Sequence, residues 1–162
     1  MPDALFLFMP CSMTAVLTRP EITSLVAQGA GRLLRALGYS ALGEVRLRTG
    51  RRVDLLALGP KGEIVIVEVK SGVEDFRADA KWPSYAPFCD GLFFAVGESF
   101  PQAMLPEAVG VMVADQFGGA IVREAPRTPL APSRRKAMTL GFARLAAARL
   151  SGASGGEDWA LG

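Results

Sequence analysis

Histidine is absent from the 162-residue chain, and cysteine occurs only at Cys11 and Cys89. These absences exclude the usual Cys/His zinc sites and every catalytic triad that depends on histidine. Any catalysis must therefore use carboxylates, lysine, tyrosine or a bound metal. Two isolated thiols supply no disulfide framework, which fits a reducing cytoplasm.

A long hydrophobic run is also missing. Residues 1–17 are apolar, but Pro10 interrupts them and Asp3 stands where a signal peptide has its basic start. The run is too short to span a bilayer, so we expect neither a membrane segment nor an export signal. We interpret residues 1–19 as an N-terminal extension and Met13 as a candidate for the true start.

The remaining composition is that of one globular domain. Half of the residues are hydrophobic and 21% are charged, which is typical of a folded chain rather than a disordered one. We assign residues 20–150 to this domain. Residues 151–162 lack a core, and we expect a flexible tail there.

The net charge of +2 conceals a segregation along the chain. Residues 19–61 carry eight basic and three acidic side chains, and residues 123–150 carry seven and one. The segment between them carries three basic and nine acidic side chains. If the two basic ends fold onto one side, they form a cationic surface for a polyanion. Alternatively, the acidic segment only neutralises the ends, or engages a protein.

Two predicted strands, 52–58 and 63–70, carry the most informative pattern. Gly59, Pro60 and Gly62 supply a turn between them. Residues 64–67 are continuously apolar and β-branched, which is typical of a strand that is covered on both faces.

Beyond the first residue of each strand, these strands carry three charged side chains, namely Asp54, Glu68 and Lys70. A buried charge normally requires a partner, a metal or water. If the strands pair, Asp54 and Glu68 converge and hold Mg²⁺ or Mn²⁺ together with the Val69 carbonyl. Lys70 then stabilises charge on a phosphate. The alternative is a strand-end ion pair between Glu68 and Lys70, with Asp54 capping a turn.

Other elements follow from periodicity and turn residues. The pattern predicts a helix over 20–37, a hairpin over 43–58, a helix capped by Ser71 with Glu74, a short helix capped by Asp79, strands over 91–97, 109–113 and 120–122, and a final helix from Ser133 to Leu150. We expect Met138, Phe142 and Leu145 to form the buried face of this last helix.

Two further side chains are candidates to assist at the site. Glu44 lies on the first strand of the hairpin and is a possible third acidic group, depending on register. Lys81 lies on the short helix, from which it could reach the same phosphate together with Tyr85. Packing in the core is the ordinary role of Tyr85.

Two clusters of basic residues are candidates for binding a phosphate backbone. At the hairpin, the alternative is that basic residues prevent edge-to-edge aggregation. In the first turn of the helix, cations oppose the macrodipole, which suggests an external use such as binding nucleic acid. The alternative there is that these side chains are only solvated. The clusters flank the hairpin turn (Arg46, Arg48, Arg51, Arg52) and occupy the first turn of the last helix (Arg134, Arg135, Lys136).

The spacing of Asp54 from Glu68-Val69-Lys70 resembles that of the PD-(D/E)XK nuclease superfamily. The run VEVKSGVEDFRADAKWPSYAPFCDGLFFAV and the final RRKAMTLGFARLAAARL resemble the MmcB-type bacterial DNA repair proteins, as do Phe100-Pro101 and Leu105-Pro106. This resemblance covers residues 20–150. It implies an α/β, restriction-endonuclease-like fold, with a central mixed β-sheet flanked by helices, and a role in DNA repair. It also implies that Asp54, Glu68 and Lys70 match the active-site pattern.

Two hypotheses about function remain open. The first is a Mg²⁺- or Mn²⁺-dependent deoxyribonuclease that acts on damaged or structured DNA, with Asp54, Glu68 and Lys70 as catalytic residues and Glu44 and Lys81 assisting. The second is a catalytically inactive module that binds DNA or a repair protein and retains the fold, with the three charges forming a buried polar network.

Overall fold

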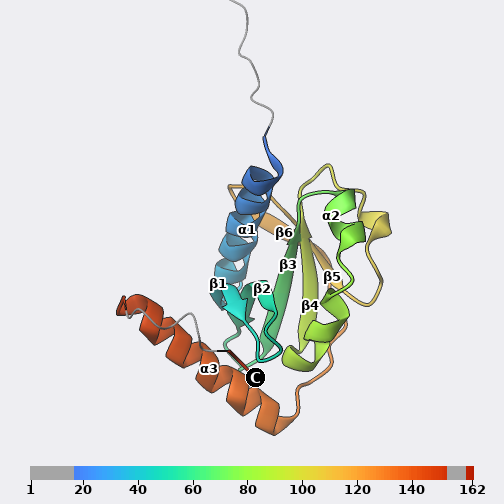
Figure 1. Cartoon of the computed structure of the whole chain (residues 1–162). Helices are drawn as coiled ribbons and strands as arrows, with labels where there is room; N and C mark the ends of the chain where they lie inside the picture. Colours follow the sequence, from blue (N-terminus) through green and yellow to red (C-terminus); the bar gives the residue numbers. More distant parts are fainter. Residues whose placement is uncertain (1–16, 153–159) are drawn as a thin grey trace, which may run out of the picture.

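A six-stranded mixed β-sheet organises the fold (Figure 1). The computed structural model describes residues 17–152 and 160–162. The expected N-terminal extension up to residue 16, with its candidate start, and residues 153–159 of the expected tail lie outside the described residues. The elements are α1 (Arg19–Ala36), β1 (Ser40–Arg46), β2 (Arg52–Leu58), β3 (Ile64–Lys70), α2 (Val73–Ala78), η1 (Trp82–Phe88), β4 (Gly91–Val96), η2 (Gln102–Met104), β5 (Gly110–Ala114), β6 (Gly119–Arg123) and α3 (Pro132–Leu150).

The strands lie in the sheet in sequence order. β1, β2 and β3 pair antiparallel, β3–β4 and β4–β5 pair parallel, and β6 returns antiparallel to β5. A parallel pair requires a crossover connection. Between β3 and β4 this connection is formed by α2, which lies near the end of β3, and by η1, which lies near the start of β4 (Figure 1).

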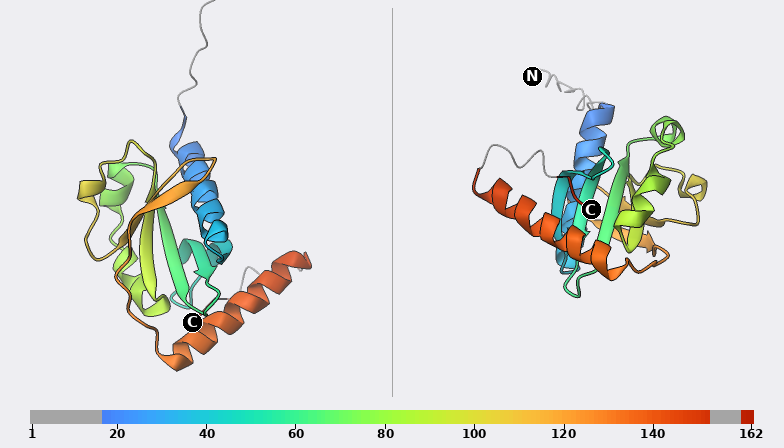
Figure 2. Two further views of the ribbon diagram at one scale, coloured as in Figure 1. Left: turned by 180° about the vertical axis from the view of Figure 1, so that it is seen from behind. Right: turned by 60° about the horizontal axis from the view of Figure 1, so that its bottom comes forward.

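Helices cover the two faces of the sheet. On one face α1 buries Val26, Ala30 and Leu34 in a core that they form with side chains of the sheet, among them Val67 and Met112. On the other face η1 and α3 pack over a second core that contains the fully buried Phe94. The helix α3 crosses the end of the molecule opposite the start of α1 (Figures 1 and 2). The expected α/β class with a mixed sheet flanked by helices is therefore confirmed, and it is consistent with a restriction-endonuclease-like fold.

Side-chain patterning placed the helices well and their caps less well. Met138, Phe142 and Leu145 are buried, as the spacing predicted. The final helix begins at Pro132 rather than after a Ser133 cap. The other two caps are also wrong, because Gly72 takes the position expected for Ser71 and Lys81 takes the position expected for Asp79.

The expected flexible tail is wrong at its end. Leu161 is 1% exposed and forms a parallel bridge with Leu47. Its N–H donates to the Arg46 carbonyl at 3.0 Å, and its carbonyl accepts the Arg48 N–H at 2.9 Å. Leu161 also packs over Gly141, where a Cβ would lie 2.8 Å from the leucine Cγ. The chain thus returns to the edge of β1 between the hairpin and α3.

An ion pair with a buried carboxylate fixes the start of α3. Asp90 is 6% exposed and accepts two hydrogen bonds from the partly buried Arg135 guanidinium, at 2.8 and 2.5 Å. The same carboxylate accepts the N–H groups of Ile64 and Leu130, and Arg135 also donates to the Gly62 carbonyl at 2.6 Å. The Arg135 side chain, expected to contact DNA, therefore ties α3 to the turn between β2 and β3.

Among the residues that the structure describes, no helix combines the length and the apolar character required to cross a bilayer.

We predict that Asp90→Ala lowers the free energy of unfolding by about 3 kcal/mol, because it removes the counter-ion of Arg135 and leaves the buried Ile64 N–H without an acceptor. Urea denaturation of the purified variant measures this loss. Lys136→Ala serves as the control, since Lys136 is exposed in the same turn of α3, and it should change stability by less than about 0.5 kcal/mol. Equal stability of the two variants would show that the pair does not anchor α3.

Candidate functional site

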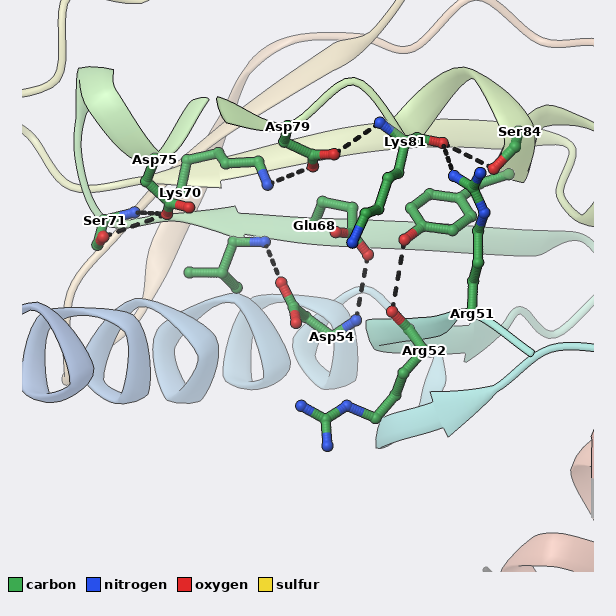
Figure 3. Close-up of polar contacts among 12 residues, drawn as sticks. Arg51, Arg52, Asp54, Glu68, Lys70, Ser71, Asp75, Asp79, Lys81 and Ser84 are labelled. Atoms are coloured by element: carbon green, nitrogen blue, oxygen red, sulfur yellow. Dashed lines mark hydrogen bonds and ion pairs between the residues drawn. The ribbon is translucent and has the colours of Figure 1, made fainter. Parts of the chain in front are cut away.

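The strands β2 and β3 separate at the level of Asp54 and Glu68. Their main-chain ladder ends at the pair Leu55–Val67, and the next pair in this register would be Asp54–Glu68. Side chains replace the missing ladder bonds there. Glu68 Oε1 accepts the Asp54 N–H at 3.2 Å, and Asp54 Oδ2 accepts the Val69 N–H at 2.7 Å (Figure 3). The structure thus brings the two predicted carboxylates together.

The Val69 carbonyl is directed toward the same gap. In an extended strand the N–H and C=O of one residue point to the same edge, and the Val69 N–H points to Asp54 on β2. Because the β2–β3 ladder has already ended at this level, β2 provides no ladder partner for the carbonyl. The site therefore offers two carboxylates and one main-chain carbonyl, all of which are hard oxygen donors.

Burial and like charge act together on the carboxylate pair. Burial, reinforced by the Asp54 charge and opposed by Lys70, raises the pKa of Glu68 to about 8. Burial also raises the pKa of Asp54, although the Val69 N–H and the Lys70 charge oppose the shift. At neutral pH Glu68 therefore holds a proton in this arrangement, and a bound cation would favour the ionised form of both groups.

Lys70 is paired with an acid that the sequence interpretation assigned only as a helix cap. Its Nζ lies 2.6 Å from Asp79 Oδ2, and the lysine is 5% exposed. Although burial favours the neutral form of Asp79, the hydrogen bonds from Lys70 and from the Lys81 N–H hold its pKa below the usual value. A buried lysine requires a counter-charge, so an acid in the segment that follows β3 could have been sought.

The two candidates from η1 and its approach lie on the Glu68 side of the sheet. The Lys81 side chain points from the start of η1 back toward Glu68 (Figure 3), and its carbonyl accepts a hydrogen bond from Arg51. Tyr85 is 3% exposed, and burial raises the pKa of its hydroxyl to about 12. Tyr85 is therefore a core residue that remains protonated, which agrees with its ordinary packing role.

A groove of about 840 Å³ opens beside the carboxylates, between the first half of α1 and α2. Asp54, Val69 and Glu44 line it, whereas Glu68 and Lys70 do not. Both of these are 5% exposed. Lys70 is paired with Asp79 in the segment that leads from β3 to η1, and the Lys81 side chain of that segment points toward Glu68 (Figure 3). The three predicted catalytic residues are therefore adjacent, but only Asp54 lines the groove.

The hairpin register, on which the role of Glu44 depended, places this residue opposite Asp54. Gly43 pairs with Leu55 and Val45 with Val53, so Glu44 lies opposite Asp54. Its carboxylate forms an ion pair with Arg52 at 2.7 Å. Among the described residues, no three His, Cys, Asp or Glu side chains gather in the manner of a metal cluster.

The basic residues predicted to bind DNA fall into two groups. Four of them have partners within the protein. Arg51 donates to the Lys81 carbonyl, Arg52 pairs with Glu44, and Arg135 pairs with Asp90. Arg134 lies over the Phe88 ring, with its Cζ 4.9 Å from the ring centroid. The other three, Arg46, Arg48 and Lys136, are exposed. Within residues 17–152 and 160–162, their side chains make no hydrogen bond or ion pair. Of the seven predicted contacts, these three remain free to meet a polyanion.

The fold and the site define the general class of the protein. It is an α/β protein with a mixed sheet, and at one end of this sheet, where two strands separate, it has a polar site of two acids and a lysine. Residues 13–156 match the family model described as DNA repair protein MmcB-like. The chain belongs to this MmcB-like family, and the membership supports a role in DNA repair. No curated protein matches the chain.

A solved structure shows the same fold. It is a protein of unknown function from Silicibacter pomeroyi, SPO1766, which is 45% identical in sequence and superimposes with a TM-score of 0.77. The match covers 80% of this chain and 89% of that chain. The likeness therefore extends over most of both chains.

We predict that Glu68 makes the protein less stable as the pH rises. Its pKa is near 4.5 when exposed and about 8 in the fold, so between these values the folded state binds a proton that the unfolded state has lost. The free energy of unfolding then falls by up to about 1.4 kcal/mol per pH unit. Glu68→Gln removes this dependence, and urea denaturation of both proteins from pH 5 to pH 8 measures the difference. Parallel stability curves would show that Glu68 ionises normally.

Proposed function

We propose that the protein is a metal-dependent nuclease that acts in DNA repair, with Asp54 and Glu68 as ligands of Mg²⁺ or Mn²⁺. One observation carries the proposal. Two carboxylates, each of which accepts a main-chain N–H from the other strand, flank the point where β2 and β3 separate, and Asp54 lines a groove there. Such placement is unfavourable for two acids by themselves, because burial and like charge both oppose their ionisation.

The donor set fits a hard divalent cation. Mg²⁺ is usually bound by one or two carboxylates and completes its octahedral shell with water and substrate oxygens. Asp54, Glu68 and the Val69 carbonyl would supply the protein ligands. When bound, the metal would polarise a phosphoryl oxygen and lower the pKa of an attacking water.

Lys70 and its neighbours would complete the chemistry. The Lys70 ammonium would stabilise charge that develops on the phosphate, because it lies on the same strand face as Glu68, two residues away. Asp79 holds this ammonium in place at 2.6 Å. Glu44 and Lys81 would assist from β1 and from the start of η1.

Access to Lys70 requires a local movement. Glu68 and Lys70 are 5% exposed, so a DNA phosphate can reach them only if the segment 78–81 moves outward. Two contacts hold this segment to the sheet and the hairpin, the Lys70–Asp79 ion pair and the hydrogen bond from Arg51 to the Lys81 carbonyl. Binding of the phosphate to Lys70 would replace the first of these contacts.

A second candidate function is a DNA-binding module without catalysis. The observation that favours it is the complete internal pairing of the polar network. Among the described residues, no buried side-chain nitrogen or oxygen lacks a hydrogen-bond partner. The network therefore is satisfied as a structural element, while Arg46 and Arg48 remain exposed for a phosphate backbone.

Cleavage assays distinguish the two candidates. With nicked, branched and single-stranded DNA and Mg²⁺ or Mn²⁺, we expect cleavage that Asp54→Asn and Lys70→Ala each reduce by about 100-fold or more. Glu98→Gln, which neutralises an exposed carboxylate elsewhere, should leave the rate unchanged. The absence of cleavage on all substrates, with DNA binding that survives Asp54→Asn and Lys70→Ala, would favour the module without catalysis.

We also predict that Arg46→Ala and Arg48→Ala weaken DNA binding. Each removes one cation that can displace a counter-ion from a phosphate, so on duplex DNA each variant should reduce the slope of log K against log salt by about 0.9. Fluorescence anisotropy over a salt series measures both affinity and slope. Arg32→Ala removes an exposed charge from α1 and is the matched control. An equal effect of all three variants would show that binding reflects net charge alone.

A further inference from the structure

Glu44 has an unusual backbone conformation. Its φ angle is 54°, and it is the one non-glycine residue with a positive φ in the part of the chain that the structure describes. The left-handed region is unfavourable for a residue with a Cβ, and such residues persist only where neighbouring groups hold them. The physical cause must therefore lie in the contacts around Glu44.

Two arginines provide these contacts. Arg149, in the last turn of α3, donates to the Gly43 carbonyl at 2.6 Å and to the Glu44 carbonyl at 3.1 Å. Arg52 pairs with the Glu44 carboxylate at 2.7 Å. The carbonyls on both sides of the Glu44 Cα and its side chain are thus all engaged. A planar guanidinium is suited to bridging two carbonyls, because its donors are fixed relative to one another.

The left-handed residue changes the face that β1 presents. In a regular strand residues 42 and 45 would point to opposite faces, yet Leu42 and Val45 pack in the same hydrophobic core. The turn at Glu44 allows both to do so while the pairing with β2 continues on either side. Glu44 itself is left opposite Asp54, and both line the groove.

We propose that Arg149 is a positioning residue of the candidate site. By binding the Gly43 and Glu44 carbonyls, it holds Glu44 in the left-handed conformation and so keeps Glu44 on the groove that Asp54 also lines. The site then depends on the docking of the last turn of α3. The conformational part of this inference stands on the geometry alone, and only its consequence for metal binding rests on the proposed function.

A thermal-unfolding cycle tests the conformational part. Glycine adopts positive φ without a penalty, so Arg149→Ala should lower the Tm by less than half as much in a Glu44→Gly background as in the wild type. Glu44→Ala is the matched control, because it removes the same carboxylate but keeps the Cβ. In that background Arg149→Ala should cost as much as in the wild type. The same loss in all three backgrounds would mean that Arg149 only ties α3 to β1, and would overturn the inference.

Metal binding tests the consequence for the site. By calorimetric titration with Mn²⁺, Arg149→Ala should weaken the affinity by about tenfold, as is typical when a group that orients a metal site is removed. Arg144→Ala removes the same charge from the same helix and should leave the affinity unchanged. Equal weakening by both variants would assign the effect to the charge of α3 and overturn positioning at the site. If the wild type binds no Mn²⁺, the proposed function fails, and the unfolding cycle by itself decides the role of Arg149.

Discussion

The exchange of hydrogen bonds between Asp54 and Glu68 is the constraint on which the site depends. Each residue uses its carboxylate to replace a ladder bond that β2 and β3 no longer make. The strands are therefore held at a fixed separation without closing, and two acids are kept close despite their like charge. Any role of this end of the sheet, catalytic or structural, begins from this arrangement.

The helix α3 connects the rest of the molecule to that arrangement. Its first turn is fixed by Arg135 to Asp90 and to the turn between β2 and β3. Its last turn reaches β1 through Arg149. Both arginines donate directional hydrogen bonds to main-chain carbonyls, and Arg135 also forms an ion pair. A helix whose sequence suggests a cationic surface thus serves in large part to hold the strands that carry the site.

Local patterns predicted much of the fold and part of the site. The short turn at Gly59–Gly62 fixes the register of β2 and β3, so the approach of Asp54 to Glu68 followed from the sequence. Three features did not follow. Asp79 was interpreted as a cap, Arg135 as a DNA contact, and the C-terminal residues as mobile. In the structure Asp79 pairs with Lys70 on β3. Arg135 and Leu161 each bind a residue that is far away in the sequence.

Periodicity and turn chemistry act over a few neighbouring residues, and they were enough to predict the strands, the pairing within the first hairpins and the residue types at the site. Which charges face inward was settled by packing between distant segments. The pairing of Arg135 with Asp90, and the left-handed Glu44 beneath Arg149, depend on contacts between residues more than 40 positions apart. Spacing along the chain carries no information about such contacts, since they form only when the layers of the fold have packed together.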